Sequence, residues 1–382
     1  MNQTEYSFLA TAPLGMEQLL AQELKDLGAT SVEEVGSSVK FKGRLEMGYR
    51  ACLWSRIASR ILLPLKVFPA ADEDRLYAGV RAIHWTDHLT AENTLAVEFN
   101  CSHSKITHSH YGALKVKDAI VDQFRAVKGT RPSVDPAKPD VRINVYLVKN
   151  EATVSLDLSG DSLHRRGYRD PYAPAPLKEN LAAALLAKAG WKAGYPGAFL
   201  DPLCGSGTLV VEAGLIAARI APGLRRDYFG FLNWQGHVPV LWRRLLKEAE
   251  ELMIREKKSI PKIVGFDQDV RSVRMALQSV ERAGLHGKVH FEKRELAACE
   301  RIAEKGILLT NPPYGERLGE VESLKPLYKL LGDTFKQKFK GWEGYIFTGS
   351  PELAKGIGLK ASQRIPFFNG PIECRLLKYD LY

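Results

Sequence analysis

The sequence has few cysteines and no long apolar run. Its five cysteines are scattered and form no Cys-x-x-Cys pair, so we expect neither a disulfide framework nor a metal site, and a reducing, cytoplasmic environment. No apolar stretch approaches the roughly 20 residues that span a bilayer. The polar segment from Met1 to Tyr6 lacks the basic-then-apolar order of a signal peptide, so no membrane partner is expected.

The composition is that of a globular protein with an excess of positive charge. The 382 residues are 45% hydrophobic and 26% charged, which suggests about two or three domains. Lysine and arginine number 54 against 44 aspartates and glutamates, a net charge of +10. This excess favours a polyanionic partner, although basic proteins without one are common.

Short apolar strands alternate with amphipathic helices along the chain. Up to residue 158 the pattern indicates α+β layers, with a long helix over about 109–128 and a hairpin of strands over 141–148 and 153–158. From residue 177 the alternation predicts a mostly parallel sheet with helices on both faces, finished by extended pieces over 357–366 and 374–382. The fold class is therefore α/β, preceded by an α+β module.

Cations and aromatic residues mark several segments of this chain. Residues 159–176 are rich in glycine, proline and arginine and are typical of a linker. The cations taken as candidate RNA contacts are Lys115, Lys117, Arg142, Arg166, Arg169 and Arg317. Phosphate recognition needs such charges on one surface, but a solvated helix face explains those on the long helix equally well.

One connection, over 221–260, is unusually long and interleaves aromatic residues with arginines. Such residues stack on unpaired bases in some RNA-binding proteins. Packing against the sheet is the alternative that we favour.

The stretch Asn311-Pro312-Pro313-Tyr314 follows the apolar run from Gly306 to Thr310. Proline has no N–H to donate to a sheet, so the strand must stop there. An Asn carboxamide, a rigid carbonyl and an aromatic ring then lie at the carboxyl end of a buried strand, where open α/β sheets bind ligands. The Asn311 oxygen and the Pro312 carbonyl each can accept one hydrogen of an NH2 group, and Tyr314 offers a face to a flat ring.

A glycine-rich turn lies between an earlier strand and the helix that begins at Thr208. The turn is Asp201-Pro202-Leu203-Cys204-Gly205-Ser206-Gly207. It lacks the lysine of a nucleotide triphosphate loop and the third glycine of a dinucleotide fingerprint. S-adenosylmethionine remains, since its ammonium and sulfonium suit Asp201. Asp267, at the end of the next strand, is placed to accept from two ribose hydroxyls.

Four strings resemble the THUMP-domain RNA guanine-N2 methyltransferases, and among these the amino-terminal half of the bifunctional 23S rRNA guanine-N2/N7 methyltransferases. They are Leu156-Asp157-Leu158-Ser159-Gly160-Asp161, His164 with Arg166-Gly167-Tyr168-Arg169, Asp201 to Thr208, and Asn311 to Leu318. The resemblance spans nearly the whole chain. It implies a ferredoxin-like domain over 1–67, a THUMP RNA-binding domain over 68–158, a linker over 159–176 and a Rossmann-like methyltransferase domain over 177–382.

The same resemblance implies site residues and a substrate. Asn311 to Tyr314 correspond to the catalytic motif, and Asp201, Pro202, Cys204 to Thr208 and Asp267 to the S-adenosylmethionine site. Glu295 stands where relatives usually place an aspartate near the adenine. The implied reaction is methylation of the exocyclic N2 of a guanine in 23S rRNA or its precursor. The chain ends at Tyr382 without a second methyltransferase half, so N7 methylation is not expected.

The Asn-Pro-Pro-Tyr motif itself does not choose among amino substrates. Guanine N2, adenine N6 and a glutamine amide fit the same groups. The alternatives are therefore tRNA guanine-N2 methylation within the THUMP class, DNA adenine methylation and protein glutamine methylation. A non-catalytic RNA-binding or maturation factor is a further alternative of a different class.

Overall fold

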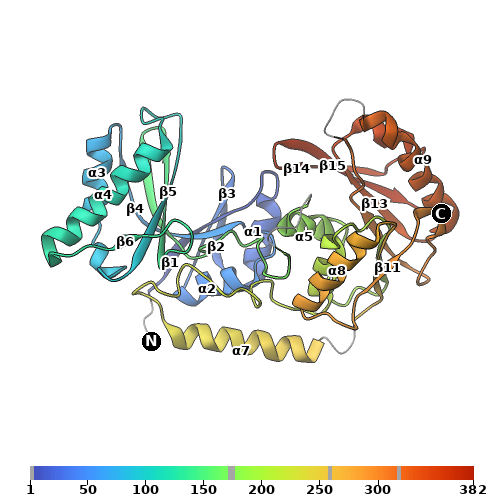
Figure 1. Ribbon diagram of the computed structural model, residues 1–382, viewed down its shortest axis with the longest axis horizontal. Coiled ribbons are helices and arrows are strands. Elements are labelled where there is room, and N and C mark those ends of the chain that lie inside the picture. The colour runs from blue at the N-terminus through green and yellow to red at the C-terminus, as the bar shows by residue number, and fades with distance from the viewer. Residues whose placement is uncertain (1–3, 171–176, 257–259, 316–319) are drawn as a thin grey trace. The chain divides into compact units, whose positions relative to one another are not determined.

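The computed structural model describes residues 4–170, 177–256, 260–315 and 320–382. The chain forms two compact units, and each is described by itself (Figure 1). The first comprises β1 (Tyr6–Thr11) with Leu20–Leu163 and Arg226–Leu245. The second is made mainly of His164–Arg225 and Leu246–Tyr382.

The first unit is built on an eight-stranded sheet with strand order β2-β3-β1-β4-β8-β7-β5-β6. After β1 come α1 (Glu17–Asp26), β2 (Thr30–Val35), β3 (Ser38–Gly43), α2 (Leu45–Trp54), β4 (Arg60–Pro69), α3 (Glu73–Arg81), a 3-10 turn (Trp85–Asp87), β5 (Thr94–Ser102), α4 (Ser109–Lys128), β6 (Ser133–Val134), β7 (Val141–Val148) and β8 (Glu151–Asp157). The expected hairpin is β7 with β8, turning at Lys149 and Asn150, whose backbone φ angles of 50° and 62° are left-handed.

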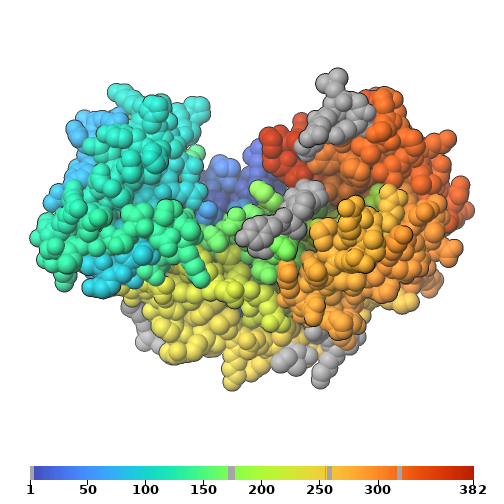
Figure 2. Space-filling model, in the orientation of Figure 1, coloured from blue at the N-terminus to red at the C-terminus, as the bar shows by residue number. Residues whose placement is uncertain are grey.

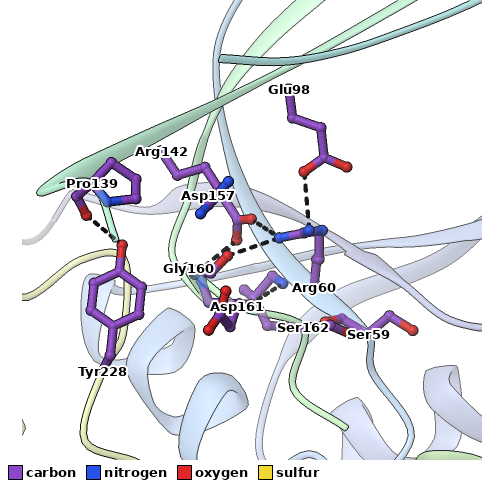
Figure 3. A network of polar contacts seen from close by, with 12 residues as sticks. Ser59, Arg60, Glu98, Pro139, Arg142, Asp157, Gly160, Asp161, Ser162 and Tyr228 are labelled. Atoms are coloured by element: carbon purple, nitrogen blue, oxygen red, sulfur yellow. Dashed lines mark hydrogen bonds and ion pairs between the residues drawn. The ribbon is translucent and has the colours of Figure 1, made fainter. Parts of the chain in front are cut away.

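A partly buried arginine, Arg60, holds the end of β8 in place (Figure 3). The guanidinium of Arg60 contacts the carboxylate of Asp157, lies 3.0 Å from Glu98 and donates to the Gly160 carbonyl at 3.0 Å. Burial raises the pKa of Asp157 to about 6, while Arg60 acts to lower it. Charge pairing across three strands therefore fixes where the chain leaves this sheet.

The segment Arg226–Leu245 is an aromatic strap that packs within the first unit. Phe229, Phe231 and Trp242 are at most 8% exposed, and the Phe231 ring stacks on Tyr49 of α2 with centroids 4.3 Å apart. Arg226 donates to the carbonyls of Ser159, Asp161 and Ser162 at 2.9–3.1 Å. These aromatics are therefore packed within the protein, as favoured, although against Tyr49 of a helix, and their faces are not open for stacking on bases.

The second unit is built on a seven-stranded sheet with strand order β11-β10-β9-β12-β13-β15-β14. Its elements are α5 (Glu179–Lys188), β9 (Ala198–Asp201), α6 (Thr208–Ala217), β10 (Ile263–Asp267), α8 (Val270–Arg282), β11 (His290–Lys293), a 3-10 turn (Leu296–Ala298), β12 (Gly306–Thr310), α9 (Glu320–Lys338), β13 (Glu343–Thr348), α10 (Pro351–Gly356), β14 (Gln363–Asn369) and β15 (Ile372–Asp380); α7 (Pro239–Glu256) leads into it. The first five strands in this order are parallel, and β15 and β14 are antiparallel.

Apolar side chains cover this sheet on one face beneath α9. Tyr328, Leu331 and Phe335 of α9 are fully buried with residues of the strands, including Leu200 and Leu308. This confirms the predicted α/β class with a mostly parallel sheet and an antiparallel finish. None of the helices in the described residues is long and apolar enough to cross a membrane.

Candidate active site

Three predicted site residues follow strands that lie side by side in the second sheet. Strand β9 pairs with β10 on one side and with β12 on the other, in parallel. Asp201 ends β9, Asp267 ends β10, and Asn311 follows directly after β12. Parallel neighbours bring their carboxyl ends to one edge of the sheet, so residues far apart in sequence meet there.

The turn after β9 is held open by backbone geometry that glycine tolerates. Gly205 and Gly207 have left-handed φ angles of 52° and 83°. A Cβ at Gly207 would lie 2.7 Å from the Phe291 ring, whereas one at Gly205 would meet nothing within 4 Å. Gly207 is therefore required for packing, and Gly205 leaves the backbone accessible to a ligand.

A carboxylate joins this turn to the next strand. The Gly205 N–H donates to one oxygen of Asp267 at 2.9 Å, and the Asp269 N–H donates to the other at 2.8 Å. These bonds fix the carboxylate's orientation and leave lone pairs for further donors such as hydroxyl groups.

A cleft of about 640 Å³ opens at this sheet edge, within the usual size range of small-molecule sites. The predicted residues that line it are Gly205, Asp267, Glu295, Asn311, Pro312, Pro313 and Tyr314. It is also lined by Leu203, Gln268, Leu296, Ala297, Gly315, Leu327, Leu330 and Asn369, which sequence reasoning did not select. Asn369 comes from the tip of the β14–β15 hairpin, 58 residues after Asn311, and no local pattern marks it.

The carboxamide of Asn311 has an unused acceptor in the cleft. Its Oδ1 atom is buried and has no hydrogen-bond partner among the described residues. A buried carbonyl oxygen left unpaired costs about 1–3 kcal/mol, so an NH donor from a ligand would be favoured there. Tyr314 is held beside it, since its hydroxyl accepts from the Asn369 side chain at 2.8 Å.

Other residues assigned to the cofactor lie beneath the turn. Asp201, Cys204 and Thr208 are 2–7% exposed and do not line the cleft, nor does Pro202. Ser206 lines a separate cavity of about 220 Å³. Burial raises the pKa of Asp201 to about 7 and that of the Cys204 thiol well above its usual range. These residues therefore support the turn from within, and of the turn's predicted cofactor residues it is Gly205 that lines the cleft.

Two of the three arginines of the 159–176 segment, Arg166 and Arg169, serve a structural purpose. Arg166 is 2% exposed, and its guanidinium lies 3.6 Å from the buried carboxylate of Glu212. Arg169 donates to the Leu177 carbonyl at 3.1 Å and to the Thr208 hydroxyl. The prediction that Arg166 contacts RNA is wrong because its charge is enclosed, and Arg169 is likewise engaged within the second unit.

Lys115, Lys117 and Arg142, three further candidate RNA contacts, lie in the first unit, where α4 is exposed on the face drawn in Figure 2. The Lys115 ammonium lies 5.7 Å from the centre of the exposed Tyr111 ring. Lys117 pairs with Asp118 at 2.6 Å, and Arg142 donates to the carbonyls of the loop before it at 3.4 Å. Lys115 with Tyr111 is thus the pair most available to a partner. Arg317 lies outside the described residues.

Comparison with protein families identifies the chain. The model of the RMKL-like methyltransferase domain matches residues 166–378, more than half of the sequence. The chain belongs to this family. A THUMP domain model matches residues 70–157, and a model of the RlmL ferredoxin-like domain matches 7–62. The predicted class of α+β modules followed by a methyltransferase fold is confirmed.

Two curated relatives of this chain share a name. The chain is 50% identical over 380 residues to the ribosomal RNA large subunit methyltransferase K/L of Syntrophotalea carbinolica, and 50% identical over 376 residues to that of Methylococcus capsulatus. Each alignment covers 98% of this chain but 53% and 51% of the relative. The chain therefore spans about half the length of the curated relatives that it matches.

Solved structures agree with the family and the fold. SMU.472, a putative methyltransferase complexed with SAH, is 32% identical with a TM-score of 0.88, over 100% of this chain and 99% of its own. A protein from Listeria monocytogenes, described as a predicted N6-adenine-specific DNA methylase, is 30% identical with the same TM-score, over 99% of this chain and 97% of its own. TrmN from Thermus thermophilus, at 20% identity and a TM-score of 0.70 over 99% of this chain and 100% of its own, shares the fold.

The buried carboxyl of Asp201 predicts a pH-dependent stability. Because burial raises its pKa to about 7 from an ordinary value of 3.8, the folded state binds more protons than the unfolded state between these values. Ionised Asp201 therefore destabilises the fold progressively as the pH rises through this window. Asn has nearly the same shape but does not ionise, so Asp201→Asn does not lose stability in this way. We therefore expect the melting temperature of the variant minus that of the wild type to increase from pH 5 to pH 8. A difference that is constant or falls with pH would contradict this.

Proposed function

We propose that this chain is an S-adenosylmethionine-dependent methyltransferase that acts on the exocyclic N2 of a guanine in 23S rRNA. The observation that carries the proposal is the unpaired, buried Asn311 Oδ1 beside Tyr314, in a cleft that also contains the glycine turn. The curated relatives' name supports rRNA as the substrate. The proposed domain organisation is a ferredoxin-like domain over 1–67, a THUMP domain over 68–158, a linker over 159–176 and a catalytic domain over 177–382.

The cleft fits the cofactor on its polar groups. Asp267 is oriented to accept from ribose hydroxyls, the open backbone at Gly205 admits a ligand, and Glu295 with Leu296 and Ala297 lines the neighbouring wall. S-adenosylmethionine, when bound, supplies an electrophilic methyl group. Glu292 does not compete for the adenine role of Glu295, since Arg294 engages its carboxylate at 3.0 Å.

The segment Asn311–Tyr314, called the clamp from here on, raises the reactivity of a poor nucleophile. The lone pair of guanine N2 is delocalised into the ring. Acceptance of its hydrogens by Asn311 Oδ1 and the Pro312 carbonyl favours the positive charge that develops on nitrogen during transfer. Tyr314, fixed by Asn369, holds the ring in line. The methylated amine is acidic and loses its proton afterwards, so no strong base is required. The guanine must leave its stack to reach the clamp.

Two observations favour RNA over the other amino substrates. The THUMP match covers 70–157, and α4 within it presents Lys115 beside the exposed Tyr111, a cation and a stacking surface. The rival substrates are tRNA guanine and DNA adenine, the latter being named for the Listeria monocytogenes protein. A non-catalytic RNA-binding factor would not need an orphaned amide oxygen beside a cofactor-sized cleft.

Replacing Asn311 separates chemistry from cofactor binding. Asn311→Ala removes one acceptor for the substrate amine, so we expect methyl transfer to fall by about 100-fold or more. Calorimetry with S-adenosylmethionine should give nearly the wild-type affinity, because the glycine turn and Asp267 are untouched. Asn311→Asp, which retains an acceptor, is the matched control and should keep more activity. Loss of both transfer and cofactor binding in Asn311→Ala would show that Asn311 is structural.

The substrate is tested by label transfer. Total RNA from a strain lacking the protein is fractionated and incubated with the purified chain and tritiated S-adenosylmethionine. We expect label in large-subunit rRNA, and N2-methylguanine after digestion. Label in tRNA would overturn the substrate, and binding of cofactor and RNA without any label would favour the non-catalytic reading.

Asn369 is expected to act by positioning Tyr314. Asn369→Ala removes the 2.8 Å hydrogen bond and should lower kcat while leaving the cofactor affinity unchanged. Tyr314→Phe removes the same bond from the other side, so the double variant should be no slower than the slower single variant. Additive losses would show that Asn369 acts independently of Tyr314.

A further inference from the structure

A second cavity, of about 660 Å³, lies in the catalytic unit between α10 and the β14–β15 hairpin. It is as large as the catalytic cleft. Arg364 and Arg375 share one face of the hairpin, because Arg375 pairs with Pro366, two residues after Arg364. Lys355 of α10 faces the same cavity from the opposite wall. Helix α10 and strands β14 and β15 thus each contribute one cationic side chain to the lining of this cavity.

The charges that line this cavity are not balanced. Glu373 is its one acidic lining residue within the part of the chain that the structure describes, and it pairs with Arg375 at 3.6 Å. The side chains of Lys355 and Arg364 form no ion pair or hydrogen bond with a described residue. Like charges around one space repel, and a bound anion removes that repulsion.

The floor of the cavity is apolar. It is formed by Leu359, Ala361 and Leu377, with the α10 residues Pro351 and Ala354 beside them. A simple inorganic anion would gain nothing from such a floor, whereas a sugar or base attached to a phosphate would bury apolar surface on it. The combination of apolar floor and cationic rim fits a nucleotide.

The cavity adjoins the clamp through a single stretch of backbone. Thr348 and Gly349, at the carboxyl end of β13, line the cavity. Gly349 also approaches the clamp so closely that an added Cβ would lie 3.1 Å from the Tyr314 ring. A strand whose guanine stacks on Tyr314 therefore has its neighbouring nucleotide within reach of the cavity.

We propose that this cavity binds a nucleotide adjacent to the methylated guanine, with its phosphate held by Lys355, Arg364 and Arg375. The proposal rests on the proposed function, since it requires that the clamp receive a base from a nucleic acid strand. It makes the hairpin a substrate-binding element that contributes to RNA affinity as well as to the orientation of Tyr314.

The test removes two charges without shortening the side chains. In Lys355→Gln/Arg364→Gln, binding to single-stranded substrate RNA is measured across a range of salt concentrations. One phosphate contact to a single strand contributes about 0.7 to the slope of log K against log salt, so loss of this contact should lower the magnitude of the slope by about 0.7. The KM for RNA should rise, while kcat at saturating RNA and the affinity for S-adenosylmethionine should stay at wild-type values.

Arg274→Gln/Lys340→Gln is the matched control, because both residues are exposed, carry the same charge and line neither cavity. A loss of slope equal to that of the control would overturn the proposal, as would an unchanged slope. Arg364→Gln alone should lower the slope in the same direction by a smaller amount than the double variant, and it provides the readout if the double variant folds poorly. Failure of the proposed function is seen separately, as wild-type protein that binds RNA with this salt dependence but transfers no label.

Discussion

The forced end of strand β12 is the constraint on which the site depends. The strand is completely buried from Gly306 to Thr310, and the prolines that follow cannot continue the sheet. The chain must turn at the point where β9 and β10 also end, so the Asn311 amide and the glycine turn meet at one edge. A side chain whose oxygen finds no protein partner is tolerated there because the rest of the motif is rigid.

Much of this arrangement is visible in the sequence, because it depends on local patterns. Strand β12 and helix α4 have the bounds expected from their apolar periodicity, and Asp201, Asp267 and Asn311 were recognised as strand ends. Strand β2 is not marked in the sequence, since its residues are mostly exposed and show no apolar alternation. Helix α10 was missed although it carries a signal: the Ser350 side chain accepts from the Leu353 N–H, and Pro351 occupies the first turn.

What could not be predicted depends on partners distant in sequence. Arg166 resembled an exposed cation in a glycine-rich linker, and its enclosure follows from Glu212, which α6 places against it. Asn369 is one polar residue at a hairpin tip until the fold brings it to Tyr314. The aromatic strap is similar: packing was favoured from its sequence, but its partner Tyr49 lies far away in the sequence and was not predicted.

The strap also determines the order in which the protein can be completed during synthesis. Its residues, Arg226–Leu245, belong to the first unit but are encoded after β9 and α6 of the second. When the ribosome has finished β8, Tyr49 still lacks Phe231, and the carbonyls of Ser159 and Asp161 still lack Arg226. The first unit therefore cannot close its last apolar cluster until part of the second has emerged. The first unit therefore does not finish folding before the second unit has begun to be synthesised.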